Sequence, residues 1–319
     1  MKVLITGSTG FIGARLATRC HEAGDHVVAL GLTNTPMETF RRDQLQMLGI
    51  EVIALPLGDT EALSRHMRGC QVIYHLAAAQ HEANVPPRHF YDVNVLGTLS
   101  MLDASIRSGV GTFVHGSTVG VYGAVLKGEL SENTPTHPDN IYGKTKLQGE
   151  QLALEYTGRL SVAVMRISET YGPGDGRLLK LFKAIDRRRF FLIGKGLNVH
   201  QPIYVDDLIQ ALLAAAARPE AVGNPILVAG RDRVTTGQMC RIIAEVLGVP
   251  PPTLRAPMWP FWLAAVVMEN TLSPLGIQPP LHRRRLDFFR NSFSFNHTMS
   301  DRLLAFHPRP ISAPAFGSR

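Results

Sequence analysis

The sequence predicts an α/β protein in which a doubly wound parallel sheet, a Rossmann fold, carries a smaller C-terminal substrate lobe. Three observations predict this architecture. Short β-branched runs alternate with amphipathic segments through the first half of the chain, as in successive β-α-β units. A glycine-rich turn comes directly after the first apolar run. Eleven of the 21 prolines lie in residues 250–319, and such a density favours a small lobe with little regular structure.

Seven apolar segments are expected to form the parallel sheet. They have the nearly continuous apolar character of strands that helices cover on both faces. Between the first two, Ile12, Leu16 and Cys20 repeat at helical spacing, and Gly24 ends that helix. The expected strands are residues 3–6, 27–30, 52–55, 72–76, 112–116, 161–166 and 226–228.

Right-handed crossovers between such strands wind the sheet in both directions from its centre. We therefore assign residues 1–171 and 203–230 to a dinucleotide-binding Rossmann domain. Residues 172–202 and 231–319 are assigned to the substrate-binding lobe. A chain of 319 residues is long enough for both parts.

The composition is that of a folded globular protein, with 45% hydrophobic and 18% charged residues. We attribute the net charge of +7 to a positive field around a phosphate-bearing cofactor and expect no nucleic-acid partner. The three cysteines lack metal-ligand or redox spacing, so we expect no metal. A strand begins directly after Met1, and the apolar stretch 257–268 is too short to cross a bilayer. The expectation is a cytoplasmic protein without a transmembrane segment.

Residues 7–13, Gly-Ser-Thr-Gly-Phe-Ile-Gly, follow the first strand and open the first helix. In this context Gly7 permits a tight turn, Gly10 lets the backbone approach a pyrophosphate, and Gly13 allows close helix–strand packing. The first N–H groups of the helix, among them those of Phe11 and Ile12, then receive the phosphates. The motif predicts that the chain binds NAD or NADP.

The end of the second strand usually decides between these two cofactors. Many such folds place an acidic residue there to bind the 2′-hydroxyl of the adenosine ribose, but this chain has Gly31. Without a carboxylate, the chain has no strong hydrogen-bond acceptor for the 2′-hydroxyl of NAD. It also has no negative charge there to repel the 2′-phosphate of NADP. Arg41 and Arg42 are the nearest basic candidates, further along the chain, and the choice stays open.

Tyr142 and Lys146 lie four residues apart, hence on one face of a helix. A neighbouring ammonium stabilises a phenolate and lowers the pKa of a phenol, which makes Tyr142 a competent proton donor and acceptor. Ser117 and Thr118 follow the strand at 112–116, at the sheet edge where open α/β folds bind ligands. Thr118 is expected to donate to the substrate oxygen that Tyr142 serves, and Ser117 to contact the cofactor or support the site.

The ordered motifs resemble those of the extended short-chain dehydrogenase/reductases. Within them the chain is similar to the NAD-dependent epimerase/dehydratase group, which includes nucleoside-diphosphate-sugar epimerases and 3β-hydroxysteroid dehydrogenase-like enzymes. The resemblance covers nearly the whole chain. Its motifs are residues 7–13, Gly58-Asp59, His75-Leu76-Ala77-Ala78, Asn94–Thr98, Ser117-Thr118, Tyr142–Lys146, Arg166 with Tyr171–Asp175, and Tyr204–Asp207.

The resemblance implies a catalytic triad of Thr118, Tyr142 and Lys146, with Lys146 also binding the nicotinamide ribose. It favours NAD slightly and implies a homodimer formed through two helices of the Rossmann domain. The further cofactor contacts that it implies are Asp59 at the adenine, the backbone of Leu76, Ala77 and Ala78 at the ribose and pyrophosphate, Asn94, Ser117, and the backbone around Thr170 near the nicotinamide.

Departures from the family pattern concern the substrate. His200 stands near the place where sugar-nucleotide members often carry an arginine, and Gln80 where some hexose epimerases have a lysine. Glu169 replaces a small polar residue. The candidate substrate contacts are therefore Gln80, Tyr171, His200 and, in the late basic run, Arg283.

The leading functional hypothesis is an NAD(P)-dependent epimerase or dehydratase that transfers a hydride and a proton at a hydroxyl or ketone carbon of a nucleotide sugar. One alternative is a reductase or dehydrogenase of an apolar alcohol or ketone. Another is a non-catalytic dinucleotide sensor. The apolar run Trp259–Leu263 is interpreted as a lid, as local core packing or as a membrane-surface contact.

Overall fold

A seven-stranded parallel sheet forms the centre of the computed structural model, which describes residues 1–80, 85–124, 128–272, 277, 279–281 and 283–311. The strand order β11-β6-β5-β4-β1-β2-β3 confirms the predicted doubly wound sheet. All seven predicted strands are present. They are β1 (Lys2–Thr6), β2 (His26–Leu30), β3 (Val52–Ile53), β4 (Val72–His75), β5 (Thr112–Thr118), β6 (Ser161–Ile167) and β11 (Pro225–Val228).

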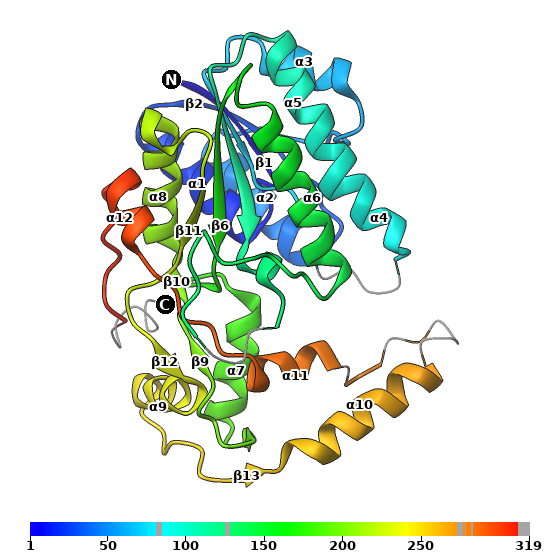
Figure 1. The fold of residues 1–319 in the computed structure, drawn as a ribbon, viewed down its shortest axis with the longest axis vertical. Helices are drawn as coiled ribbons and strands as arrows, with labels where there is room; N and C mark the ends of the chain where they lie inside the picture. Colours follow the sequence, from blue (N-terminus) through cyan, green and yellow to red (C-terminus); the bar gives the residue numbers. More distant parts are fainter. Residues whose placement is uncertain (81–84, 125–127, 273–276, 278, 282, 312–319) are drawn as a thin grey trace.

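Helices cover both faces of this sheet (Figure 1). Successive side chains of a strand point to opposite faces, so Val3 and Ile5 enter one core and Leu4 enters the other. The first core also receives α1 (Phe11–Glu22), α2 (Pro36–Met47) and α8 (Val205–Ala217). The second receives α3 (Thr60–Met67), α5 (Gly97–Arg107) and α6 (Ile141–Glu155). A short α4 (Pro87–Tyr91) leads through the π-helix η1 (Asp92–Leu96) into α5.

The smaller lobe lies below the sheet in Figure 1 and consists of short strands and helices. Its core is formed by α7 (Gly176–Asp186), α9 (Thr236–Leu247) and β8 (Leu192–Ile193). The remaining elements are β7 (Thr170–Tyr171) paired with β10 (Ile203–Tyr204), β9 (Val199–His200) paired with β12 (Val234–Thr235), β13 (Arg255–Ala256), α10 (Met258–Leu272) and α11 (Arg283–Arg290).

The C-terminal helix α12 (Thr298–Leu304) returns to the Rossmann domain. Its Leu303 and Leu304 are buried in the first core, which also contains α8 and β11. Beyond it, Arg309 forms an ion pair with Asp207 of α8 at 2.7 Å. Residues 298–304 therefore pack with the sheet, and the sequence-based division, which placed them in the lobe, is corrected here because an apolar pair closes the sheet face next to β11.

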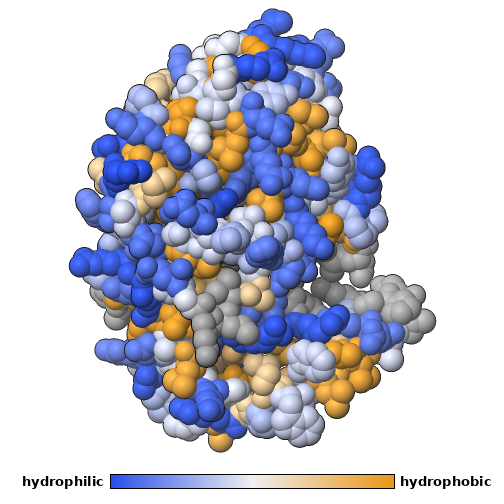
Figure 2. Space-filling model, in the orientation of Figure 1, coloured by the Kyte–Doolittle hydropathy of each residue, from blue (hydrophilic) through white to orange (hydrophobic). Residues whose placement is uncertain are grey.

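The surface differs between the two parts. Figure 2 shows hydrophilic side chains spread over much of this face, with apolar side chains exposed around α10 at the lower right. Among the described residues, no helix combines the length and the apolar character needed to cross a membrane. The longest helices, α6 and α10, have 15 residues.

A buried ion pair connects β6 to α6. Arg166 donates to Glu150 at 2.6 Å, and their side chains are only 7% and 2% exposed. A second guanidinium nitrogen donates to the hydroxyl of Tyr122 at 2.8 Å, and the hydroxyl of Ser117 donates to the other Glu150 oxygen at 2.6 Å. The network fixes α6 against the carboxyl ends of β5 and β6.

Substitution Glu150→Ala should lower the free energy of unfolding by about 3–5 kcal/mol, because Arg166 would keep its charge inside the protein without a partner. Glu155→Ala is the matched control, since Glu155 is exposed on the same helix. It should change the free energy by no more than about 0.5 kcal/mol. Urea denaturation measures both, and equal losses in the two variants would contradict a structural role for the buried pair.

Candidate active site

Residues 7–13 form a turn that depends on the absence of side chains. Gly7 has a φ of 68°, and a Cβ there would lie 2.9 Å from the backbone nitrogen of Ala77. A Cβ on Gly13 would lie 2.1 Å from the carbonyl oxygen of Gly7. Gly10 is the N-cap of α1, and no side chain caps the first N–H groups of that helix. The turn therefore fits a pyrophosphate, which these N–H groups and the helix dipole would hold.

The packing around Gly31 explains why no acid stands at the end of β2. A Cβ on Gly31 would lie 2.7 Å from Cγ2 of Thr9 and 2.9 Å from Oγ of Ser8. The hydroxyl of Thr9 donates to the carbonyl oxygen of Leu32 at 2.7 Å, which holds its side chain in this place. The room that a carboxylate would need is filled by the glycine-rich turn itself.

Arg41 is the basic residue that reaches the cofactor turn. Its guanidinium donates to the carbonyl oxygens of Thr9 at 3.3 Å and Gly174 at 2.8 Å, and lies 6.0 Å from the centre of the Phe11 ring. Arg42 instead pairs with the adjacent Asp43. Arg41 thus connects the phosphate turn to the loop that enters the substrate lobe.

A buried polar chain holds the loop after β4 against β1. The hydroxyl of Thr6 accepts from the backbone N–H groups of residues 76 and 77 at 3.2 and 3.1 Å. It also contacts Nδ1 of His75 at 2.9 Å, whose Nε2 lies 3.1 Å from the hydroxyl of Thr98. Burial lowers the pKa of His75 to about 3, so the imidazole is neutral. The N–H groups of residues 76 and 77 are thus used to hold the loop in place. A cofactor would contact other backbone atoms of the loop.

Asn94 joins the same loop to α6. Its amide nitrogen donates to the carbonyl oxygen of Ala79 and to the hydroxyl of Thr145, both at 3.0 Å, and its oxygen accepts from the N–H of Ala79 at 2.9 Å. Both amide hydrogens are used in this way. Asn94 therefore positions η1 against α6, and its predicted cofactor contact stays a prediction.

Thr118 and Tyr142 both lie near Gly120. A Cβ on Gly120 would be 3.4 Å from Oγ1 of Thr118 and 3.8 Å from Cε1 of Tyr142. Thr118 ends β5, and its hydroxyl oxygen accepts from the N–H of Gly120 at 3.1 Å, which leaves the hydroxyl hydrogen to donate. Tyr142 is the second residue of α6, which Asn140 caps through the N–H of Gly143 at 3.0 Å. The two hydroxyl-bearing side chains are thus brought to one place by the predicted elements.

Lys146 lies one helical turn beyond Tyr142 and is only 2% exposed. Its ammonium donates to the carbonyl oxygen of Gly116 at 2.6 Å. Burial lowers the pKa of Lys146 to about 8, although the carboxylate of Glu150 acts in the opposite direction. Lys146 therefore carries its proton below about pH 8, beside the end of β5 where Thr118 stands. Thr118 at the end of β5 and Tyr142 and Lys146 on α6 are therefore placed on adjoining elements, and their catalytic roles stay a prediction.

Ser117 has a different use from the predicted cofactor contact. Its hydroxyl hydrogen is donated to Glu150 in the buried network with Arg166. Through this network Ser117 stabilises the position of α6 at the end of β5. The sequence analysis did not identify Glu150, although a charged residue inside the apolar run 161–166 signals that a buried counter-charge must lie opposite it.

Two other residues with predicted contacts have partners within the protein. Asp59 caps α3, accepting from the N–H of Ala62 at 2.9 Å, and is exposed. His200 is 1% exposed, with Glu169 2.9 Å from Nδ1 and Thr236 3.0 Å from Nε2, and these partners connect elements of the lobe. The adenine contact of Asp59 and the substrate contact of His200 stay predictions.

Arg283 does not stand free as a phosphate clamp. Its Nε forms an ion pair with Glu269 of α10 at 2.7 Å, and its backbone N–H donates to the same carboxylate at 2.6 Å. The side chain of Arg283 is 58% exposed. The pair connects the start of α11 to α10, and the predicted substrate contact of Arg283 stays a prediction.

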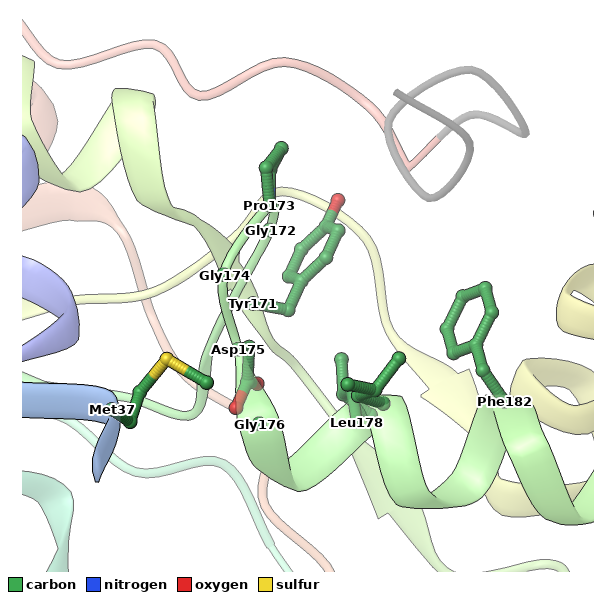
Figure 3. Close-up of a pocket in the computed structure, with 10 residues that line it drawn as sticks. Met37, Tyr171, Gly172, Pro173, Gly174, Asp175, Gly176, Leu178 and Phe182 are labelled. Carbon is green, nitrogen blue, oxygen red and sulfur yellow. The ribbon is translucent and has the colours of Figure 1, made fainter. Parts of the chain in front are cut away.

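A pocket lies where the loop after β7 enters α7 (Figure 3). Tyr171 forms part of its wall, as predicted for a pocket residue, and Met37 of α2 faces it from the Rossmann domain. Tyr171 is buried, and its ring packs edge-on against Tyr204 at 5.5 Å. Thr118, Tyr142 and Lys146 do not line this pocket, and Gln80 and Thr170 do not either. The pocket adjoins Gly174, the loop residue that Arg41 holds.

The thiols and the described acidic and imidazole side chains form no metal set. Cys20, Cys70 and Cys240 are buried and free. Within the described ranges, no group of three His, Cys, Asp or Glu residues could hold a metal ion.

Comparisons with known proteins identify the family of the chain. The family model described as "NAD dependent epimerase/dehydratase family" matches residues 3–230. A dTDP-glucose 4,6-dehydratase of Streptomyces antibioticus is 32% identical over 269 residues, 78% of each chain. An uncharacterized UDP-glucose epimerase of Bacillus subtilis strain 168 is 27% identical, over 78% of this chain and 83% of its own. The crystal structure of a UDP-glucuronic acid 4-epimerase from Bacillus cereus in complex with NAD shares the fold, with a TM-score of 0.80 and 22% identity over 99% of this chain and 96% of its own.

Substitution Gly13→Ala should weaken NAD binding at least 100-fold, because the added Cβ would collide with the carbonyl oxygen of Gly7 and displace the start of α1. Gly158→Ala is the control, since no atom lies within 4 Å of a Cβ there and Gly158 is exposed. Isothermal titration with NAD measures both. Undiminished affinity in Gly13→Ala would show that the turn does not seat the pyrophosphate.

The affinity for NAD should fall about tenfold as the pH rises from 7 to 9.5. The pKa of Lys146 is lowered to about 8. Its side chain is therefore protonated well below pH 8 and loses its positive charge as the pH rises through that value. Lys146→Met should bind more weakly at pH 7 and show no such decline. A wild-type affinity that is constant over this range would contradict a charged Lys146 at the cofactor.

Proposed function

The chain belongs to the NAD-dependent epimerase/dehydratase family of extended short-chain dehydrogenase/reductases, and from that premise we propose that it is a nucleotide-sugar 4-epimerase or a closely related enzyme. It binds NAD or NADP. The names of its dTDP-glucose and UDP-glucose relatives support a sugar carried on a nucleoside diphosphate over an apolar alcohol or ketone. The intact set of Thr118, Tyr142 and Lys146 argues against a non-catalytic sensor.

The observation that carries the proposal is the placement of Thr118 and Tyr142 near Gly120, with the Lys146 ammonium at Gly116 of the same strand end. Tyr142 takes the proton of a sugar hydroxyl and later returns it. The ammonium of Lys146, held at Gly116, stabilises the phenolate form of Tyr142 and would bind the nicotinamide ribose. Thr118 donates its hydroxyl hydrogen to the same sugar oxygen. The nicotinamide supplies the hydride acceptor and donor.

The residues after Thr118 favour epimerisation over dehydration. Elimination of water needs further groups that remove a proton from carbon and protonate the departing hydroxyl. Here Thr118 is followed by Val119, Gly120 and Val121, of which both valines are buried and none carries an acid or base. Epimerisation requires only the proton exchange that Tyr142 performs, with the hydride returned to the opposite face of a retained ketone.

We further propose a homodimer and a cytoplasmic location. A groove between η1, the start of α5 and α6 supports the dimer, because it is lined by apolar side chains among polar ones on two Rossmann helices. Its apolar members are Tyr91, Val95, Leu96, Leu99 and Leu152. The three free cysteines support a reducing compartment.

Tyr142→Phe should lower turnover on the true UDP- or dTDP-sugar by about 10²–10⁴-fold, because no other group takes the hydroxyl proton. Thr118→Val should lower it by about 10²-fold through loss of one hydrogen bond to the developing oxyanion. Tyr156→Phe is the control and should keep full activity, because Tyr156 follows the other end of α6 and its hydroxyl donates to Asp103.

A panel of UDP- and dTDP-hexoses with mass-spectrometric and NMR product analysis measures these effects. The proposal expects an epimer of unchanged mass with no net formation of reduced cofactor. A product lighter by the mass of one water molecule would show that the enzyme catalyses dehydration instead of epimerisation. Full activity of Tyr142→Phe would overturn the assigned chemistry.

A further inference from the structure

Among the described residues, helix α10 packs one of its sides against the rest of the protein. Met258, Phe261 and Ala265 recur at helical spacing and pack into a small cluster. On the other side of that cluster are Ile193 of β8 and the α11 residues Leu286 and Phe289. Figure 1 shows α10 extending away from the body of the molecule with α11 above it. Its outer side is therefore left to the surroundings.

Large apolar side chains occupy that outer side as well. Trp259 is 69% exposed, Trp262 44%, Leu263 52% and Val267 52%. Their spacing of three, one and four residues places them on one side of a helix, and we refer to these four as the α10 stripe. Figure 2 shows apolar side chains exposed where α10 lies. The exposed side of a helix on a water-soluble domain is normally polar, and this one is not.

The only charged residue within α10 is Glu269, which is paired with Arg283. An α-helix that is apolar on all sides is found where both sides are covered. The rest of the protein covers the inner side of α10. The outer side is equally apolar, which is typical of a surface that contacts another apolar environment.

Two cations flank the N-terminal end of the stripe. Lys195 follows β8, and Arg255 lies in β13, which pairs with β8 directly before α10. Both are exposed, and neither forms an ion pair with a described residue. Leu254 beside Arg255 is 73% exposed. Positive charge bordering an apolar stripe matches the arrangement of anionic headgroups above acyl chains.

We propose that the α10 stripe is a docking site for the surface of an anionic phospholipid bilayer. With 15 residues, α10 is too short to span the hydrocarbon region but long enough to lie in the interface. Tryptophan prefers that interface because its ring is apolar and its N–H is polar, and both tryptophans of this chain belong to the stripe.

A bilayer fits the stripe better than a second copy of the chain. Four side chains that are each about half exposed present on the order of 500 Å² of surface, whereas a stable dimer buries about 800 Å² per partner. The stripe is also a ridge on an outlying helix, a shape that enters a planar lipid surface more readily than it fills an interface between two rigid proteins.

Intrinsic fluorescence tests the proposal directly, because Trp259 and Trp262 are the only tryptophans and both report on α10. The full-length protein is titrated with vesicles of equimolar phosphatidylglycerol and phosphatidylcholine, and with vesicles of phosphatidylcholine alone. We expect a blue shift of the emission and quenching by brominated acyl chains with the anionic vesicles. Binding to the neutral vesicles should be at least tenfold weaker.

Co-sedimentation with the same vesicles compares variants. Trp259→Ser/Trp262→Ser should reduce binding at least tenfold, and Lys195→Gln/Arg255→Gln should reduce it severalfold for anionic vesicles only. Met47→Gln is the matched control, because Met47 is 79% exposed on α2 and should not affect binding. Far-UV circular dichroism and NAD binding of each variant show that it is folded.

Unchanged tryptophan emission in the presence of anionic vesicles would overturn the proposal. So would a blue shift that depends on protein concentration without lipid, accompanied by a doubled mass in light scattering, since the stripe would then be a contact between two copies. Equal binding of the Trp259→Ser/Trp262→Ser variant would also overturn it, by placing the lipid contact elsewhere.

Discussion

The close approach of α6 to the end of the sheet is the constraint on which the active site depends. Two missing side chains permit it. A Cβ on Gly143 would lie 2.6 Å from the carbonyl oxygen of Gly120, and one on Gly149 would lie 2.4 Å from that of Asn94. The helix therefore rests on the backbone of the turn after β5 and on η1. From that position Tyr142 and Lys146 reach the carboxyl end of β5, just as Gly13 lets α1 reach the phosphate turn.

Buried charged side chains make this arrangement rigid, and neighbouring groups offset the free-energy cost of burying them. Arg166 and Glu150 neutralise each other behind the site, with Ser117 and Tyr122 satisfying the remaining atoms. Lys146 has a carbonyl oxygen and the nearby Glu150 carboxylate, and its lowered pKa shows the remaining cost of burial. Burial also keeps His75 uncharged next to this ammonium. Of these buried groups, Lys146 is the one whose lowered pKa, about 8, lies near neutral pH.

Most of the fold could be predicted from the sequence, because it depends on local patterns, and the same kind of pattern generates the prediction of the catalytic residues. The seven apolar runs became the seven strands of the sheet, and the spacing of Tyr142 and Lys146 places them on one helix. Side-chain partners distant in sequence could not be predicted in this way. Glu269 uses the charge of Arg283, and His200 lies among buried partners in the lobe. The return of α12 to the sheet was missed for the same reason, since a seven-residue helix carries little periodic signal.

The proposed function requires three side chains from β5 and α6 to converge on a dinucleotide seated at residues 7–13. A crystal structure with NAD bound measures this most directly. It should show the pyrophosphate at the N–H groups that begin α1, and the hydroxyls of Thr118 and Tyr142 directed at one point beside the nicotinamide. A Tyr142 hydroxyl turned away from that point, or a cofactor bound elsewhere on the chain, would contradict the account.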